Sequence, residues 1–470
     1  MPPKSSSDKN PKNSAFSKKE KKKSAYSYLP DGYPLDYVRV AVADLDGILR
    51  GKMMAVEKYL SACEKGFGFC DVVFGWDSSD VAYDNLTYTG WHTGYPDAMV
   101  TLYPETARRI PWLDDCLMVL GDFEEPAPCP RRLLKNIAGE AEKMGFLPVF
   151  SQEFEWFNFR DPLCPFGNKF EQGFRVPESL TQGMFGYSML RLAENSHFWT
   201  QLFKDLKAAG VPLEGLHTET GPGVAEAAIQ HAPVVEAADR ATLFKTFVKQ
   251  IARQHSIMAS FMAKWNENLP GCSGHVHQSL ADGNNGKNLF FDAKKPNGLS
   301  DLAESYIAGV LHCLPHVLPM YAPNVNSYKR LVEGAWAPTT ITWGFDNRTT
   351  ALRVIVQGEK ATRLEMRVAG SDANPYLAMA ACLASGLFGI REKMKLKIAP
   401  TQGNGYMDER NGRLPSNLWE AVQIMKHSEL AHQLFGKNFV EHFTATREAE
   451  WKRFMRPVTD WEIARYFEII

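Results

Sequence analysis

Three short segments alternate between apolar and ionisable residues, and this alternation constrains the fold of the 470-residue chain more than any other feature. Side chains at positions i and i+2 of a β-strand point to the same face of a sheet. Each segment therefore predicts a strand that buries one apolar face and presents ionisable groups on the other. The segments are VFSQEFEWFNF with Glu153 and Glu155, GCSGHVHQSL with His275 and His277, and TRLEMRV with Arg363, Glu365 and Arg367.

An antiparallel sheet with one solvated face also produces such alternation, so any one strand alone has this simpler explanation. Together the segments predict more, because clustered carboxylates repel one another unless cations lie between them. Carboxylate oxygens with few imidazoles suit Mg²⁺ or Mn²⁺ better than zinc. A fourth acidic segment, HTETGPGVAE, adds Glu219 and Glu226 around a glycine-proline turn.

Arginines form the second group of candidate site residues: Arg330, Arg348, Arg353, Arg363 and Arg367. Scattered surface arginines are the alternative interpretation. Beside a metal cluster, however, a guanidinium fork binds two oxygens of a phosphate or carboxylate. The acids and arginines together indicate phosphoryl transfer to a carboxylate. The sequence contains neither a GxxxxGK[ST] phosphate loop nor a dinucleotide fingerprint.

The bulk composition is that of a globular protein, with 44% hydrophobic residues, 23% charged residues and a net charge of −1. Small-molecule partners are therefore expected, and neither nucleic acid nor a membrane. The 8 cysteines form no CxxC pair, and no apolar stretch is long enough to span a membrane. We expect reduced thiols and a cytoplasmic location.

The chain is long enough for two domains. Residues 1–28 are polar and lysine-rich and are predicted to be a disordered basic tail, with contact to nucleic acid or a membrane surface as the less specific alternative. A hairpin around the turn Asp44–Gly47 begins a small strand-rich domain over 29–125, and a helix over 130–144 begins a larger domain over 126–470. Further helices are predicted at 239–254, 301–318 and 374–394.

Seven motifs occur in an order that resembles the glutamine synthetase family over residues 35–470. They are DLDGILRGK, EFEWF, HTETGPGVAE, GCSGHVHQSL, NVNSYKRL, DNRTTALR and RLEMRVAGSDANPYLAMAA. The resemblance is strongest to the bacterial-type branch that includes γ-glutamylpolyamine, γ-glutamylputrescine and other γ-glutamyl-amide synthetases. It implies an α+β fold with an N-terminal β-grasp domain and a catalytic domain with a curved antiparallel sheet and helices. It also implies a homo-oligomer of stacked rings with active sites between subunits.

The resemblance further implies a role for each candidate residue. Glu155, Glu219 and Glu226 would hold one divalent metal, and Glu153, His275 and Glu365 the other. Arg330 and Arg367 would bind glutamate, whereas Arg348, Arg353 and Arg363 would lie around phosphates, with Arg348 and Asp77 also catalytic. His277, Ser279 and Lys360 would contact ATP. In the implied reaction, ATP phosphorylates the γ-carboxylate of glutamate with Mg²⁺ or Mn²⁺ bound, and a small amine then displaces phosphate.

The sequence departs from ammonia-using members at the implied amine site. EGAWAP places Trp336 where those members have a glutamate, and WDSSD keeps Asp77 but has Asp80 where a serine is usual. Trp336 either packs a loop or forms an aromatic wall that admits an organic amine. We favour an organic amine; an ammonia-using glutamine synthetase and an inactive structural relative are the alternatives.

Two further departures concern the acid substrate and regulation. Gly271 and Cys272 stand where the ammonia enzyme has an asparagine and a glycine near bound glutamate. This difference weakens the assignment of glutamate as the acid substrate by resemblance. The segment NGYMDERNGRLP does not match the loop that carries the adenylylation tyrosine of some bacterial enzymes. We therefore predict no such modification.

Overall fold

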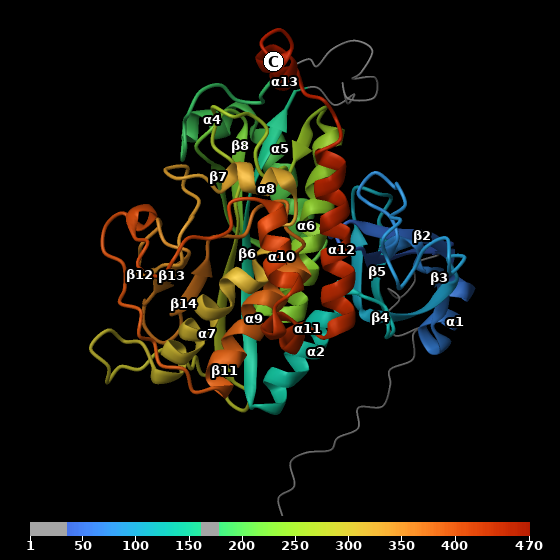
Figure 1. Ribbon diagram of the computed structural model, residues 1–470. Coiled ribbons are helices and arrows are strands. Elements are labelled where there is room, and N and C mark those ends of the chain that lie inside the picture. Colours follow the sequence, from blue (N-terminus) through green and yellow to red (C-terminus); the bar gives the residue numbers. More distant parts are fainter. Residues whose placement is uncertain (1–34, 161–177) are drawn as a thin grey trace, which may run out of the picture.

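A five-stranded sheet occupies the N-terminal part of the computed structural model, which describes residues 35–160 and 178–470 (Figure 1). Its order is β2-β1-β5-β4-β3, and β1 and β5 run parallel while the other neighbours are antiparallel. The strands are β1 (Tyr37–Ala43), β2 (Leu49–Ala55), β3 (Phe67–Cys70), β4 (Asp97–Ile110) and β5 (Cys116–Phe123), with helix α1 (Val56–Lys65) and the 3₁₀-helix η2 (Asp71–Phe74). The predicted tail over 1–28 lies outside the described residues.

The predicted hairpin is confirmed, since β1 and β2 pair antiparallel. The carboxylate of Asp44 closes the turn by accepting the backbone N–H groups of Asp46 and Ile48, each at 2.9 Å. Gly47 has a φ of 76°, which residues with a side chain rarely adopt. A Cβ at Gly47 would lie 3.2 Å from the Cα of Asn374. The turn of the small sheet therefore packs closely against a distant part of the chain.

A nine-stranded sheet forms the larger part of the molecule, in the order β12-β13-β14-β11-β6-β8-β7, with β9 and β10 also paired to β6. Its neighbours are antiparallel except for β12 and β13. The strands are β6 (Phe146–Phe159), β7 (Leu213–Thr218), β8 (Val224–Ile229), β9 (Ala232–Pro233), β10 (Met258–Ser260), β11 (Gly274–Asp282), β12 (Trp343–Phe345), β13 (Leu352–Ile355) and β14 (Arg363–Met366). The division of the chain into domains at residue 125 remains a prediction.

Helices cover one face of this sheet (Figure 1). The helices that follow β5 in the described chain are α2 (Pro130–Lys143), α4 (Met189–Glu194), α5 (Ser196–Ala208), α6 (Val234–Gln254), α7 (Asp301–Val317), α8 (Val325–Arg330), α9 (Pro375–Arg391), α10 (Leu418–Lys426), α11 (Glu429–Phe435), α12 (Lys437–Phe454) and α13 (Asp460–Tyr466), with the 3₁₀-helices η3 (Leu318–Met320) and η4 (Gly405–Met407). Of these, α2, α6 and α9 pack against β6. All four predicted helices are present. Helix α6 begins earlier than predicted, directly after Pro233, and Asn374 caps α9 through the backbone N–H of Tyr376 at 3.0 Å.

The apolar side chains of the alternating strands lie under these helices. Phe154 and Trp156 are fully buried, and Phe154 stacks on Phe244 of α6 with ring centroids 5.6 Å apart. Val276 of β11 and Leu364 of β14 are buried in the same core. The predicted alternation is thus confirmed, and it leaves the ionisable side chains of β6, β11 and β14 on the opposite face. Within the described ranges, no helix has the length and hydropathy of a membrane span.

Helix α12 runs beside the small sheet (Figure 1), and His442 joins α12 to the 3₁₀-helix η2. Its Nε2 donates to the carbonyl oxygen of Phe74 at 3.0 Å, and burial lowers the pKa of His442 from 6.5 to about 4. Between pH 6.5 and 4 the unfolded chain therefore binds a proton that the folded chain does not. The contribution of the neutral His442 to the free energy of unfolding is present in full above pH 6.5. It is lost as the pH falls from 6.5 to 4.

We expect this loss to reach about 3 kcal/mol. His442→Gln keeps a donor for Phe74 but does not titrate, so the variant loses that much less stability than the wild type between pH 6.5 and 4. Denaturant unfolding across this range measures the difference. His231→Gln, at an exposed imidazole, is the matched control for the loss of a histidine. Parallel wild-type and His442→Gln curves contradict the prediction.

Candidate functional site

The register of the large sheet gathers the ionisable residues into three rows that cross neighbouring strands. Residues directly opposite one another on paired strands have Cβ atoms about 5 Å apart. Groups far apart in the sequence therefore meet on one surface. The rows are Glu155–Glu226–His217 across β6, β8 and β7; Glu153–His275 across β6 and β11; and Arg353–Glu365–His277 across β13, β14 and β11.

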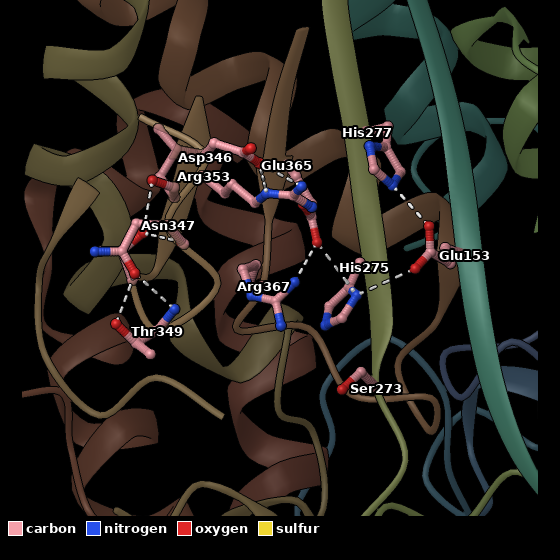
Figure 2. A network of polar contacts seen from close by, with 12 residues as sticks. Glu153, Ser273, His275, His277, Asp346, Asn347, Thr349, Arg353, Glu365 and Arg367 are labelled. Atoms are coloured by element: carbon pink, nitrogen blue, oxygen red, sulfur yellow. Dashed lines mark hydrogen bonds and ion pairs between the residues drawn. The ribbon is translucent and has the colours of Figure 1, made fainter. Parts of the chain in front are cut away.

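His275 lies between two carboxylates (Figure 2). Its Nδ1 is 3.4 Å from Glu365 Oε1 and 3.8 Å from Glu153 Oε1. Burial and the charge of Arg367 lower the pKa of His275 to about 4. The ring is therefore neutral at neutral pH. Its Nε2 is buried and has no hydrogen-bond partner in the described part of the chain, so a ring nitrogen remains available as a ligand.

Glu365 is also held by two arginines (Figure 2). Arg353 Nη1 donates to Oε2 at 2.7 Å, and Arg367 Nη1 donates to Oε1. Burial favours the neutral acid, but His275 and the arginines outweigh it and lower the pKa of Glu365 to about 2. Arg353 Nη2 continues the network to Asp346 at 2.5 Å. Glu365 is thus ionised and surrounded by positive charge.

Glu153 and Glu226 are neighbouring carboxylates whose pKa values shift in opposite directions. Burial and the neighbouring Glu153 raise the pKa of Glu226 far above its ordinary value. Burial opposes ionisation of Glu153 as well, but hydrogen bonds from Glu226, His275 and His277 outweigh it and hold the pKa of Glu153 well below the usual range. His277 Nε2 lies 3.1 Å from Glu153 Oε2. Acidic groups this crowded without a counter-ion favour the binding of a cation.

His217 is a candidate ligand that the sequence interpretation missed. His217, Glu219 and Glu226 each offer a ligand atom, and these atoms all lie within 4.8 Å of one another, so the three could hold a metal ion. The sequence did carry a signal, because His217 and Glu219 are two residues apart in HTE, as in the other alternating strands. Glu155 lies beside Glu226 in the same row, and its Oε2 accepts the backbone N–H of Ser273 at 2.6 Å.

The two predicted glutamate-binding arginines, Arg330 and Arg367, lie next to this surface. Arg330 is buried, and its Nη2 donates to Ser273 Oγ at 2.8 Å and to the carbonyl oxygen of Arg367 at 3.1 Å. Burial raises the pKa of Tyr406, whereas Arg367, Arg330 and the backbone of Trp336 oppose that rise. Tyr406 is therefore close to both the arginine pair and the Trp336 loop.

The remaining predicted residues lie further out or have other contacts. Arg363 Nε is 3.4 Å from His277 Nδ1, and Ser279 Oγ makes only a long contact of 3.5 Å with the carbonyl oxygen of Val149. Arg348 and Lys360 are exposed. Their contacts with phosphate and ATP stay predictions.

Asp77 and Trp336 occupy separate loops. The Asp77 carboxylate pairs with Arg453 of α12 and accepts the backbone N–H groups of Ser79 and Val81, each at 2.9 Å. Within the described chain, the polar partners of Asp77 are therefore not residues of the large sheet's ionisable face. Trp336 is 58% exposed at a φ of 57°. Both interpretations of Trp336, loop packing and an aromatic wall at the amine site, stay predictions.

Known proteins resemble this chain over most of its length. A family model described as glutamine synthetase, catalytic domain, matches residues 127–466. Type-1 glutamine synthetase 2 of Dictyostelium discoideum is 50% identical over 442 residues, covering 92% of this chain and 84% of the relative. Glutamate–isopropylamine ligase of Pseudomonas sp is 36% identical over 446 residues, covering 93% and 96%. A solved structure of GmaS with ADP has a TM-score of 0.79 and 27% identity, covering 92% and 97%.

The chain therefore belongs to the glutamine synthetase family and is a ligase of that type. The predicted family and α+β fold are confirmed. The relatives include a protein named glutamine synthetase, one named glutamate–isopropylamine ligase and one named γ-glutamylethanolamide synthetase, so family membership leaves the amine open.

Proposed function

We propose that this protein uses ATP to join the γ-carboxylate of glutamate to an organic amine through a γ-glutamyl phosphate. The observation that carries the proposal is Trp336. Its exposed indole stands where the resemblance places a carboxylate in ammonia-using members, and its backbone lies beside Tyr406, close to Arg330 and Arg367. An indole attracts an alkylammonium by cation–π and apolar contact, whereas a carboxylate binds ammonium.

The donor set fits two divalent cations, the cofactors that the resemblance implies. The fit rests on the His275 ring, whose Nδ1 lies 3.4 Å from Glu365 Oε1 and 3.8 Å from Glu153 Oε1, and on Glu219 Oε2, which is buried without a partner among the described residues. Bound Mg²⁺ or Mn²⁺ would neutralise charge on the phosphates of ATP. The proposed ligand sets are Glu153, His275 and Glu365 for one ion and Glu155, Glu219 and Glu226 for the other.

The arginines supply the positioning of substrates. Arg330 and Arg367 orient the carboxylate of glutamate, and Glu365 fixes the Arg367 guanidinium through their ion pair. Arg348, Arg353 and Arg363 bind phosphate oxygens, and His277, Ser279 and Lys360 contact ATP. In this arrangement a γ-carboxylate oxygen attacks the terminal phosphorus and ADP leaves.

The amine nitrogen then attacks the γ-carbonyl carbon, phosphate leaves, and the nitrogen loses a proton. Asp77 is proposed to accept that proton in the site of a neighbouring subunit, because within its own chain it faces Arg453. This assignment includes the proposal of a homo-oligomer with sites between subunits. Phosphate is a far better leaving group than hydroxide, which is why the acid is phosphorylated first.

Glutamine synthesis from ammonia is the second candidate, favoured by the 50% identity to a relative named glutamine synthetase. An inactive relative is disfavoured, because all six proposed metal-binding side chains are present and clustered carboxylates are costly without a cation.

The test is ATP-dependent phosphate release by the purified full chain with Mg²⁺ or Mn²⁺ and glutamate. Ammonia is compared with methylamine, ethanolamine, putrescine, spermidine, isopropylamine and aniline. We expect one organic amine to give a kcat/KM at least about 10-fold above that of ammonia, which corresponds to about 1.4 kcal/mol of selectivity. A preference for ammonia supports the second candidate, and no release with any amine overturns the proposed activity.

A further inference from the structure

The first row of the site ends in an imidazole that the family resemblance does not count among the metal ligands. We propose that His217 is a fourth protein ligand of the ion held by Glu155, Glu219 and Glu226, and that its nitrogen makes this site select Mn²⁺ over Mg²⁺. The inference rests on the proposed function for the identity of the site. The inference adds a fourth ligand and a metal preference to that site.

The register of the sheet places His217 in line with two of the carboxylates. Glu155 lies opposite Glu226, and Glu226 lies opposite His217, on three consecutive strands. All three side chains therefore project from the same face of the sheet. Glu219 follows two residues after His217, directly after the end of β7, and its carboxylate lies near those of the same group.

The hydrogen bonding of the His217 ring leaves one nitrogen for a metal. Nδ1 lies 3.1 Å from the carbonyl oxygen of Thr218, which can only accept, so Nδ1 carries the proton and Nε2 presents its lone pair. A histidine that ligates a metal is commonly oriented in this way by a carbonyl on its other nitrogen.

The distance from His217 Nε2 to Glu226 Oε1 is 3.8 Å, too long for a hydrogen bond. Two ligands of one ion with bonds of about 2.1 Å lie at most about 4.2 Å apart. The observed separation therefore suits two atoms that share an ion between them.

An orphaned oxygen points independently to a cation. Glu219 Oε2 is buried and accepts no hydrogen bond from any described residue, although it lies 3.7 Å from the protonated Nδ1 of His217. A buried carboxylate oxygen without a donor is unfavourable unless a positive charge is near. A metal ion in this group would satisfy it.

Tyr187 holds the imidazole in place. Its ring stacks on His217 with centroids 4.4 Å apart and an interplanar angle of 29°. The Tyr187 backbone has a φ of 56° and donates to the carbonyl oxygen of Thr218 at 2.7 Å. A strained conformation of this kind persists where the surroundings fix it. Tyr187 is thus a positioning residue for the proposed ligand.

The imidazole decides the metal preference. Sites made of carboxylates alone suit Mg²⁺ and Mn²⁺ alike, whereas an imidazole nitrogen favours first-row transition ions. Mn²⁺ should therefore bind this site more tightly than Mg²⁺, and removal of the nitrogen should narrow the difference.

The experiment measures Mn²⁺ binding to the full chain from the EPR signal of free Mn²⁺, with Mg²⁺ as competitor. In His217→Asn we expect Mn²⁺ affinity at one site to fall about 10- to 100-fold and Mg²⁺ affinity to change by less than about 3-fold. His217→Asp restores an oxygen ligand, so it should bind both ions with lower Mn²⁺ selectivity. His231→Asn is the matched control at an exposed imidazole and leaves both affinities unchanged.

Two comparisons separate the possible failures. Glu226→Gln removes a ligand that the proposed function already requires, so unchanged Mn²⁺ binding in that variant overturns the metal site itself. If Glu226→Gln weakens binding while His217→Asn does not, or if His217→Asn weakens Mn²⁺ and Mg²⁺ equally, the role of His217 is wrong. Tyr187→Ala should weaken Mn²⁺ binding, and Tyr187→Phe, which keeps the stacked ring, should not.

Discussion

Replacing Trp336 with glutamate is expected to shift the amine preference from the organic amine towards ammonia, changing the ratio of the two kcat/KM values about 10- to 100-fold. The indole contributes a cation–π attraction of about 0.5–2 kcal/mol and an apolar contact of similar size. A carboxylate removes both and offers ammonium a partner. Steady-state kinetics with saturating ATP and glutamate, varying each amine in turn, measure the shift.

The backbone at Trp336 decides which variants are informative. Its φ of 57° is strained for any residue with a side chain, so glutamate and alanine keep the same strain while glycine would relieve it. Trp336→Ala should lose the organic amine without gaining ammonia. Trp419→Glu, at a tryptophan 38% exposed on α10, is the matched control and should leave both rates unchanged. If Trp336→Glu keeps the wild-type preference, the indole is not the selector.

The charged surface of the site was predictable because strand alternation is local. In the segment around Glu153 and Glu155, neighbouring residues alone determine which side chains share a face. The same reasoning correctly placed His275 and His277 on the ionisable face of β11 and Glu365 on the ionisable face of β14. Helix ends were predicted as well where a local signal was present, as at Asn374 before α9.

The order of the strands was not predictable, because it depends on pairing between distant segments. β6 separates β11 from β8, and this arrangement forms the rows. His217 was missed for that reason, since its importance lies in facing Glu226 on the neighbouring strand β8. The ion pair between Asp77 and Arg453 joins residues far apart in the sequence, and no periodicity indicates it.

The domain boundary, the ring assembly and the roles of individual site residues stay predictions. Each depends on a property that one chain does not display, such as a bound substrate or a neighbouring subunit. The exposed Arg348 and Lys360 illustrate the point, because an arginine or lysine awaiting phosphate and one that is simply solvated have the same surroundings.

Replacing Arg131 with methionine is expected to lower the free energy of unfolding by about 3–5 kcal/mol, because a buried ion pair loses one partner. Arg131 of α2 donates twice to Asp239 of α6, at 2.9 Å each, and once to Asp122 of β5 at 3.2 Å. Asp122 keeps Arg132 and Lys135 in the variant. Asp239 keeps only the hydroxyl of Tyr376 in this network, at 2.7 Å, and its charge remains buried.

Urea unfolding followed by circular dichroism measures the loss, with Arg391→Met as the matched control. Arg391 pairs with Glu140 at 3.1 Å, but the two side chains are 39% and 51% exposed, so that variant should cost at most about 1 kcal/mol. Adding Asp239→Asn to Arg131→Met removes the orphaned charge and should recover part of the loss. If Arg131→Met costs no more than Arg391→Met, the buried network does not stabilise the contact of β5 with helices α2 and α6, and that contact must depend on apolar packing instead.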